Sequence, residues 1–249
     1  MPKFLRNTVS RLYYRYETYI SGIVDAVIFP CTINGKHPFE GRARVTEFIN
    51  NVPILDEFSE KVDFTQNGRT VCCAGGLTHD RGLEVLIDAS YKVGARVILA
   101  GTITPKEYAD KIKLKESYGS VDFRGRCTHE EVIKIYENAA VGSSTILPVG
   151  QYPKGENLPT KVYEYMAMGM PFIMSDFSYC QRFNNKYKCC VLIDPTDVDS
   201  VAEGLSYIFD NPEEAIQMGM RGRLAAEKDF NWSVEETKLI NLYSKLYDN

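Results

Sequence analysis

Short apolar runs alternate with longer amphipathic segments along most of this chain, and this alternation limits the possible folds. Eight runs of strand length are almost entirely apolar, at 24–29, 45–49, 70–74, 96–100, 120–123, 141–147, 171–174 and 189–193. Segments with helical periodicity lie at about 82–93, 104–118, 129–140, 160–168, 198–210, 213–228 and 233–247. Such apolar runs are typical of parallel strands that are covered on both faces. The pattern therefore predicts an α/β fold with a doubly wound parallel sheet.

The first fifty residues do not follow this pattern. They open with an amphipathic helix whose apolar stripe contains Leu5, Val9, Leu12, Tyr13, Tyr16 and Ile20, while Arg6, Arg11 and Arg15 lie elsewhere around it. One helix and two strands cannot bury a core of their own. We therefore expect the main domain to begin near residue 53 and the preceding segment to be the end of something larger.

The charge and the cysteine content of the chain limit the classes of function that it can have. The chain has 249 residues and a net charge of −4, whereas a dedicated nucleic-acid binder should be basic, so no nucleic-acid partner is expected. No apolar run approaches the roughly 20 residues of a membrane span, and the N-terminus lacks the core of an export signal. Seven cysteines without CxxC spacing indicate reduced thiols in a cytoplasmic protein. The three histidines are scattered, so we expect no metal site.

A glycine-rich turn follows the strand at 70–74. The sequence VCCAGGLTHDRGL runs from this strand into Gly75 and Gly76, then through Arg81 into a helix. Glycines allow close approach of the backbone to a ligand, and a helix N-terminus favours anions. Arg81 adds a positive charge suited to phosphate oxygens. The turn is not GxGxxG, and no acidic residue ends the next strand, so NAD binding is not supported.

A second unusual loop spans 147–159 and leads into a helix that starts near Pro159. Glu156 precedes this helix and Glu164 lies inside it, seven residues apart. In a sheet of order 3-2-1-4-5-6, this loop and the glycine-rich turn follow neighbouring strands at the ligand-binding crevice. Two helix N-termini, Arg81 and Lys161 would then face phosphates. The carboxylates would accept hydrogen bonds from sugar hydroxyls.

Three helix ends carry recognisable signals. Thr128 and Ser233, each with a glutamate three residues later, predict capping boxes, and Gly169 predicts a helix stop. The DxD sequence at 197–199 opens a helix, so it is interpreted as a cap rather than a metal site.

Several stretches, in order, resemble the group 1 glycosyltransferases, which are retaining GT-B enzymes with two facing Rossmann-like domains. They are GGLTHDRGLEVLIDAS, VDFRGRC, ENLPTKVYEYMAMGMPFIMSD, VLIDPTDVDSVAEGLSYIFDNPEEAIQMG and FNWSVEETKLINLY. The resemblance covers about residues 20–249 and includes the E-x7-E pattern of Glu156 and Glu164. It implies that the chain is mainly the C-terminal, donor-binding half of this architecture.

The resemblance also implies roles for individual residues. Glu164 would bind the ribose hydroxyls of a nucleoside diphosphate sugar, and Glu156 would face the transferred sugar. Arg81, beside Gly75 and Gly76, would bind the diphosphate and stabilise its departure. Leu158, Pro159, Thr160 and Lys161 would lie near the phosphates, and Arg124 and Arg126 near the nucleobase. Glu156 and Arg81 are the candidate catalytic residues, with no metal and no cofactor besides the nucleotide-sugar substrate.

Two departures from the family pattern stand out. Gly76 occupies a position where many members carry a second basic residue. The family's N-terminal domain, which supplies the acceptor site, is mostly absent. We therefore divide the chain into a remnant of that acceptor domain at 1–52, a nucleotide-sugar-binding domain at 53–232 and a returning helix at 233–249. The chain would be a truncated piece, a gene fragment or one half of a split enzyme.

The predicted function is transfer of a sugar, with retention, to a glycan or lipid-linked acceptor in surface polysaccharide biosynthesis. The partners would be the donor, the acceptor and the missing domain or a partner subunit. The N-terminal helix would pack on that domain, or else make peripheral contact with anionic lipid on the inner face of the membrane. Two different functions also fit the chain as a whole. It could be a non-catalytic nucleotide-sugar-binding or assembly subunit, or a nucleotide-sugar 2-epimerase-like protein.

Overall fold

The computed structural model describes residues 3–58 and 63–247, which fold into two compact units. The small unit comprises residues 1–51, 154–157 and 233–249, and the sheet unit comprises 52–153 and 158–232. The short segment 154–157 thus leaves the sheet unit and joins the small unit, which the sequence does not indicate.

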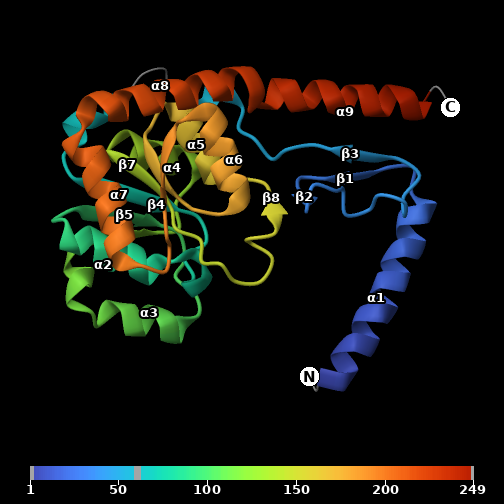
Figure 1. Ribbon diagram of the computed structural model, residues 1–249, viewed down its shortest axis with the longest axis horizontal. Coiled ribbons are helices and arrows are strands. Elements are labelled where there is room, and N and C mark those ends of the chain that lie inside the picture. Colours follow the sequence, from blue (N-terminus) through green and yellow to red (C-terminus); the bar gives the residue numbers. More distant parts are fainter. Residues whose placement is uncertain (1–2, 59–62, 248–249) are drawn as a thin grey trace. The chain divides into compact units, whose positions relative to one another are not determined.

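A six-stranded parallel sheet forms the centre of the sheet unit (Figure 1). Its strands are β4 (Thr70–Ala74), β5 (Arg96–Ala100), β6 (Val121–Gly125), β7 (Val141–Ser144), β9 (Phe172–Ser175) and β10 (Cys190–Ile193). The spatial order is β10-β9-β7-β4-β5-β6, which is 3-2-1-4-5-6 from the other end. The predicted sheet order is confirmed, and β4 and β7 are neighbours.

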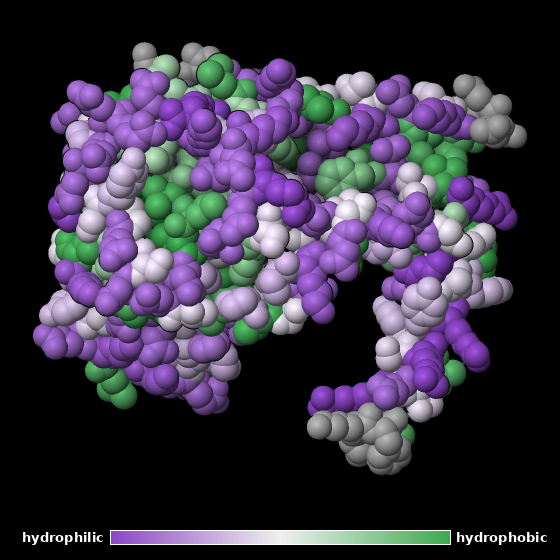
Figure 2. All heavy atoms as spheres, viewed as in Figure 1, coloured by the Kyte–Doolittle hydropathy of each residue, from purple (hydrophilic) through white to green (hydrophobic). Residues whose placement is uncertain are grey.

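Helices cover both faces of this sheet. They are α2 (Leu83–Lys92), α3 (Lys106–Lys113), α4 (His129–Glu137), α5 (Thr160–Met168), α6 (Ser178–Tyr187), α7 (Val198–Asp210) and α8 (Pro212–Asp229). Alternate strand residues enter two cores: Cys72 packs with residues of α4, α5 and α6, and Cys73 with residues of α2, α3 and α7. Polar and charged residues cover most of the face of this unit that Figure 2 shows.

The helix-end signals have mixed outcomes. Thr128 forms the predicted capping box with Glu131, and α5 ends at Gly169 in the left-handed conformation. Asp197 caps α7 through the Asp199 N–H, as expected. The box predicted at Ser233 is wrong, because α9 (Trp232–Tyr247) has already begun one residue earlier.

The small unit contains two short pairs of strands. β1 (Val27–Phe29) pairs in parallel with β3 (Thr46–Phe48), and β2 (Thr32–Ile33) pairs antiparallel with β8 (Gly155–Glu156). Its N-terminal helix is α1 (Lys3–Ile23). No helix in the described part of the chain is long and apolar enough to cross a membrane. All seven cysteine thiols are free.

Candidate active site

The glycines that directly follow β4 and β5 are each hydrogen-bonded to the last residue of the neighbouring strand, at the carboxyl edge of the sheet. The Gly75 N–H donates to the Ala100 carbonyl at 2.9 Å, and the Gly101 N–H donates to the Gly125 carbonyl at 2.6 Å. Gly101 has a φ of 140°, and a Cβ there would lie 2.0 Å from the Gly75 carbonyl oxygen. Only glycine fits this position, so Gly101 shapes the edge although the sequence carries no signal for that role.

The glycine-rich turn and the loop after β7 meet, as the predicted sheet order requires. The Thr145 hydroxyl donates to the Arg81 carbonyl at 3.0 Å, and the Leu147 N–H donates to the Asp80 carbonyl at 2.9 Å. Gly82, which directly follows Arg81, has a φ of 65°. These backbone contacts fix the short 3₁₀ turn His79–Arg81 that carries the candidate phosphate-binding arginine.

The Arg81 side chain is half-buried and remains without a carboxylate partner among the described residues. Its guanidinium carbon lies 5.3 Å from the centre of the Tyr152 ring. The cation–π contact orients the group without neutralising its charge. Gly75 and Gly76 are exposed, and nothing lies within 4 Å of a Cβ built on either. Arg81 and an open stretch of backbone are therefore available to an anion.

Helix α5 begins at the same edge, directly after the loop that follows β7. Leu158 is buried and Pro159 precedes the first helical residue, Thr160. The N-terminus of a helix carries partial positive charge. Lys161 is 8% exposed, and its ammonium lies 3.1 Å from the Cys73 thiol at the end of β4. The lysine therefore points inward over the sheet, which its place in the sequence does not indicate.

Glu164 lies on the second turn of α5 and is half-buried. Its Oε2 accepts a hydrogen bond of 2.6 Å from the hydroxyl of Tyr136 on α4. No ion pair joins Glu164 to Lys161 among the described residues, so a plain surface pair does not explain them. Tyr136 is a site neighbour that sequence reasoning missed, because a tyrosine on the apolar face of a helix is typical of a core residue.

Glu156 belongs to the small unit rather than to the sheet unit that holds Glu164. It lies in β8, where its Oε2 accepts a hydrogen bond of 2.7 Å from the Thr32 hydroxyl on β2. The neighbouring Asn157 side chain donates to the Pro30 carbonyl at 2.6 Å. The structure thus brings Glu156 together with Thr32, a residue without a signal in the sequence.

The arginines predicted near the nucleobase lie at the end of β6, the edge strand next to β5. Arg124 donates to Asp122 at 2.7 Å, and Arg96 also binds this carboxylate. Burial opposes ionisation of Asp122, but the hydrogen bonds from the two arginines outweigh it and lower its pKa. Arg126 is exposed beyond the strand. Arg124 is therefore partly neutralised, whereas Arg126 forms no ion pair within the described part of the chain.

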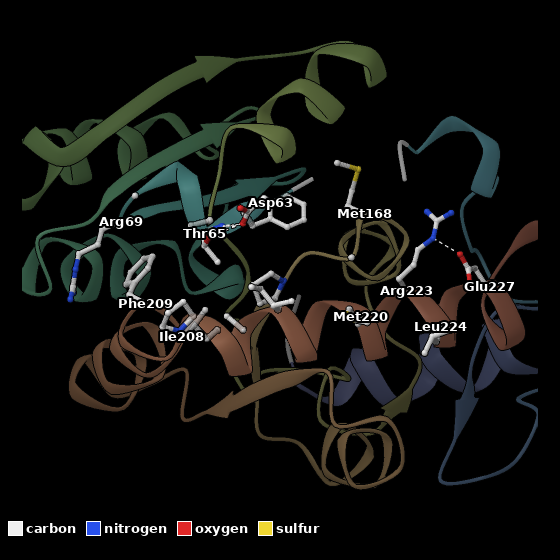
Figure 3. A pocket seen from close by; sticks show the side chains of 18 residues that line it. Asp63, Thr65, Arg69, Met168, Ile208, Phe209, Met220, Arg223, Leu224 and Glu227 are labelled. Atoms are coloured by element: carbon white, nitrogen blue, oxygen red, sulfur yellow. Dashed lines mark hydrogen bonds and ion pairs between the residues drawn. The ribbon is translucent and has the colours of Figure 1, made fainter. Parts of the chain in front are cut away.

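A large apolar cavity lies at the opposite, amino edge of the sheet (Figure 3). Its volume is about 820 Å³, and Ile216, Met220 and Leu224 of α8 line it. Its two arginines are paired, Arg223 with Glu227 at 2.7 Å and Arg69 with Asp210 at 2.5 Å. It contains none of the predicted site residues. We place the candidate site at the carboxyl edge, where uncompensated polar groups converge.

No group of three or more potential metal ligands occurs in the described ranges 3–58 and 63–247. The carboxyl edge instead combines a cation, exposed backbone, a helix N-terminus and a carboxylate. Such a combination suits a ligand with anionic phosphates at one end and hydroxyl donors at the other.

The six-stranded parallel sheet with helices on both faces defines a Rossmann-like α/β class of protein. Residues 56–225 match the family described as "Glycosyl transferases group 1", and the chain belongs to this family. Its sheet and the solved neighbours below also confirm the GT-B type of fold.

Among curated relatives, the chain is 23% identical over 188 residues to a GDP-mannose-dependent mannosyltransferase of Corynebacterium glutamicum that acts on a phosphatidylinositol monomannoside. The match covers 74% of this chain and 49% of that protein, so the chain spans about half the length of this relative.

Solved structures show the same fold at low identity. A sucrose-phosphate synthase from Thermosynechococcus elongatus has a TM-score of 0.70 at 20% identity, covering 93% of this chain and 61% of that one. Anabaena HepE in complex with UDP and glucose also has a TM-score of 0.70, at 15% identity, covering 93% of this chain and 66% of that one.

Proposed function

We propose that this chain supplies the donor-binding part of a retaining glycosyltransferase. The whole enzyme would transfer a sugar from a nucleoside diphosphate sugar to a glycan or lipid-linked acceptor in surface polysaccharide biosynthesis. One observation carries the proposal: hydrogen bonds hold the Arg81 backbone against the loop that follows β7, at the same edge of the sheet where Gly75 and Gly76 follow β4. The family membership of residues 56–225 and the mannosyltransferase relative support it.

Each group has a distinct task in this proposal. Arg81 and the N-terminus of α5 stabilise the negative charge that develops on the departing diphosphate. Glu164 accepts hydrogen bonds from ribose hydroxyls, and Glu156 faces the transferred sugar. The acceptor attacks from the face that the diphosphate leaves, and no metal ion is required.

The remaining partner would be the acceptor-side domain or a partner subunit. In the small unit, α1 contacts its own unit through one face, where Arg42 pairs with Glu17 at 2.7 Å and covers the Tyr14 ring at 4.6 Å. The other face keeps Leu12 and Tyr16 exposed, at 60% and 64%. We propose that the acceptor-side domain or a partner subunit covers this stripe. Because arginines flank the stripe, peripheral contact with an anionic membrane is the alternative.

Calorimetric titration of the chain with UDP, GDP, ADP, CMP and dTDP, with and without EDTA, tests the function. We expect saturable binding of one diphosphate that EDTA does not change. Arg81→Ala and Glu164→Ala should each weaken this binding by about tenfold or more, the scale of a lost charge-assisted hydrogen bond. Arg182→Ala is the matched control, because it removes an exposed guanidinium that lies 5.8 Å from the Tyr179 ring. Unchanged dissociation constants in folded Arg81 and Glu164 variants would contradict the proposal.

A further inference from the structure

A buried tyrosine on α4 donates a hydrogen bond to the carboxylate of Glu164. The Tyr136 hydroxyl donates to Glu164 Oε2 at 2.6 Å, and the Tyr136 side chain is fully buried. From this geometry we infer that Tyr136 is a positioning residue, which orients the Glu164 carboxylate for the hydroxyls of the donor. The inference rests on the proposed function, in which Glu164 binds the donor.

Packing leaves the Tyr136 ring little freedom. Its ring centre lies 5.1 Å from that of Tyr165, and the two planes cross at 73° in an edge-on arrangement. Tyr165 is itself fully buried and packs against the backbone of β7, where a Cβ at Gly142 would lie 2.6 Å from the Tyr165 ring. These contacts therefore fix the position of the Tyr136 hydroxyl next to the second turn of α5.

The direction of the hydrogen bond is chemically fixed. Burial and the neighbouring Glu164 carboxylate raise the pKa of Tyr136 well above its ordinary value, so the tyrosine keeps its proton. It can then only donate to the carboxylate, which accepts. A carboxylate accepts through two oxygens, and Tyr136 contacts Oε2 alone. Oε1 accepts no hydrogen bond from the residues that the structure describes, so it can accept one from a ligand.

Preorganisation is the physical benefit. A glutamate side chain that is free to rotate must be ordered when the ligand binds, and that ordering reduces affinity. The Tyr136 hydrogen bond orders it beforehand. A purely structural bond between α4 and α5 would stabilise the fold equally in the presence and absence of ligand.

Tyr136→Phe separates these two roles because it removes one oxygen and retains the ring. We expect it to weaken binding of the preferred nucleoside diphosphate about three- to tenfold, the scale of ordering one side chain. Tyr165→Phe is the matched control: it removes a buried hydroxyl that donates to the Ser143 carbonyl at 3.2 Å and does not touch Glu164. Its dissociation constant should equal that of the wild type.

The double variant Tyr136→Phe/Glu164→Ala completes the cycle. If Tyr136 acts through Glu164, the tyrosine substitution has no further effect on affinity once the carboxylate is gone. If the losses of affinity in the two single variants add in the double variant, or if Tyr136→Phe binds as tightly as the wild type, the inference about Tyr136 is overturned. The proposed function is still supported in either case, provided that Glu164→Ala weakens binding. Wild-type protein that binds no nucleoside diphosphate overturns both. Circular dichroism and thermal unfolding of each variant establish that the compared proteins are folded.

Discussion

Gly82 supports the candidate site through its backbone. Its φ is 65°, and a Cβ would lie 1.9 Å from the Thr145 carbonyl oxygen. Gly94 has nearly the same φ, 66°, but nothing lies within 4 Å of a Cβ there. We expect Gly94→Ala to lower the free energy of unfolding by about 1–2 kcal/mol, the cost of the left-handed conformation. Gly82→Ala should cost several kcal/mol, because the clash is added. Urea unfolding of the two variants measures the difference, and equal losses would show that the clash is relieved at little cost.

Among individual residues, sequence reasoning identifies those whose chemistry is visible in a motif. Arg81 and Glu164 belong to this group, and both lie at the carboxyl edge of the sheet. Tyr136 does not belong to this group, because only its hydrogen bond to a carboxylate on another helix distinguishes it from a core tyrosine. The inward orientation of Lys161 is seen only from its contact with Cys73, which lies 88 residues away in the sequence. Such contacts follow from the packing of elements and have no local signal.

At the scale of elements, α4 offers a test of its predicted cap. The Thr128 hydroxyl accepts from the Glu131 N–H at 3.3 Å, and the Glu131 carboxylate accepts from the Thr128 N–H at 2.7 Å. We expect Thr128→Ala to lower the free energy of unfolding by about 1 kcal/mol. Thr128→Ser retains the hydroxyl and should remain within a few tenths of the wild type. A serine variant as unstable as the alanine variant would show that the cap is not responsible.

The contact between Glu84 of α2 and Lys115, which follows α3, predicts a pH dependence. A hydrogen bond from Lys115 outweighs burial and lowers the pKa of Glu84 below its ordinary 4.5. Since the folded pKa is below the unfolded one, the stabilisation is present above about pH 4.5 and is lost as the pH falls through the folded pKa. Glu84→Gln should therefore show a smaller loss of stability on acidification than the wild type. Identical slopes in unfolding free energy against pH would rule out this contribution.

The elements themselves are largely predictable, since β4 and β5 have the bounds that their apolar runs indicate. Helix α6 (Ser178–Tyr187) is missed because its sequence SYCQRFNNKY is mostly polar and its two buried residues give a weak period. β2 and β8 have two residues each and pair across 124 positions, from Thr32 to Glu156. A strand so short is defined by its partner rather than by its own composition.

At the scale of the whole molecule, the apolar stripe of α1 predicts association. Leu12 and Tyr16 are exposed at 60% and 64%, and exposed stripes of this kind drive association in solution. We expect the wild-type chain to sediment as more than a monomer and Leu12→Glu to sediment closer to a monomer. Leu114→Glu is the control, because Leu114 is 88% exposed outside α1. Binding of the wild type to vesicles containing phosphatidylglycerol, lost in Leu12→Glu, would favour the membrane alternative. A monomeric wild type that also ignores vesicles would contradict a docking role.

The sheet order could be predicted because alternating apolar strands and helices admit few right-handed topologies. The assignment of 154–157 to the small unit could not, because it depends on the pairing of β8 with β2. The sequence therefore predicts a site at the carboxyl edge but does not indicate that Glu156 and Glu164 belong to different units.

Hydrogen–deuterium exchange of the wild-type chain with a saturating nucleoside diphosphate tests the central claim most directly, because it locates the ligand. We expect slower exchange in residues 75–83 and 158–165, which contain the glycine-rich turn, Arg81 and the start of α5. We expect no change at 63–69 and 216–224, which line the apolar cavity at the other edge. Protection confined to that cavity, or no protection at saturation, would contradict the claim.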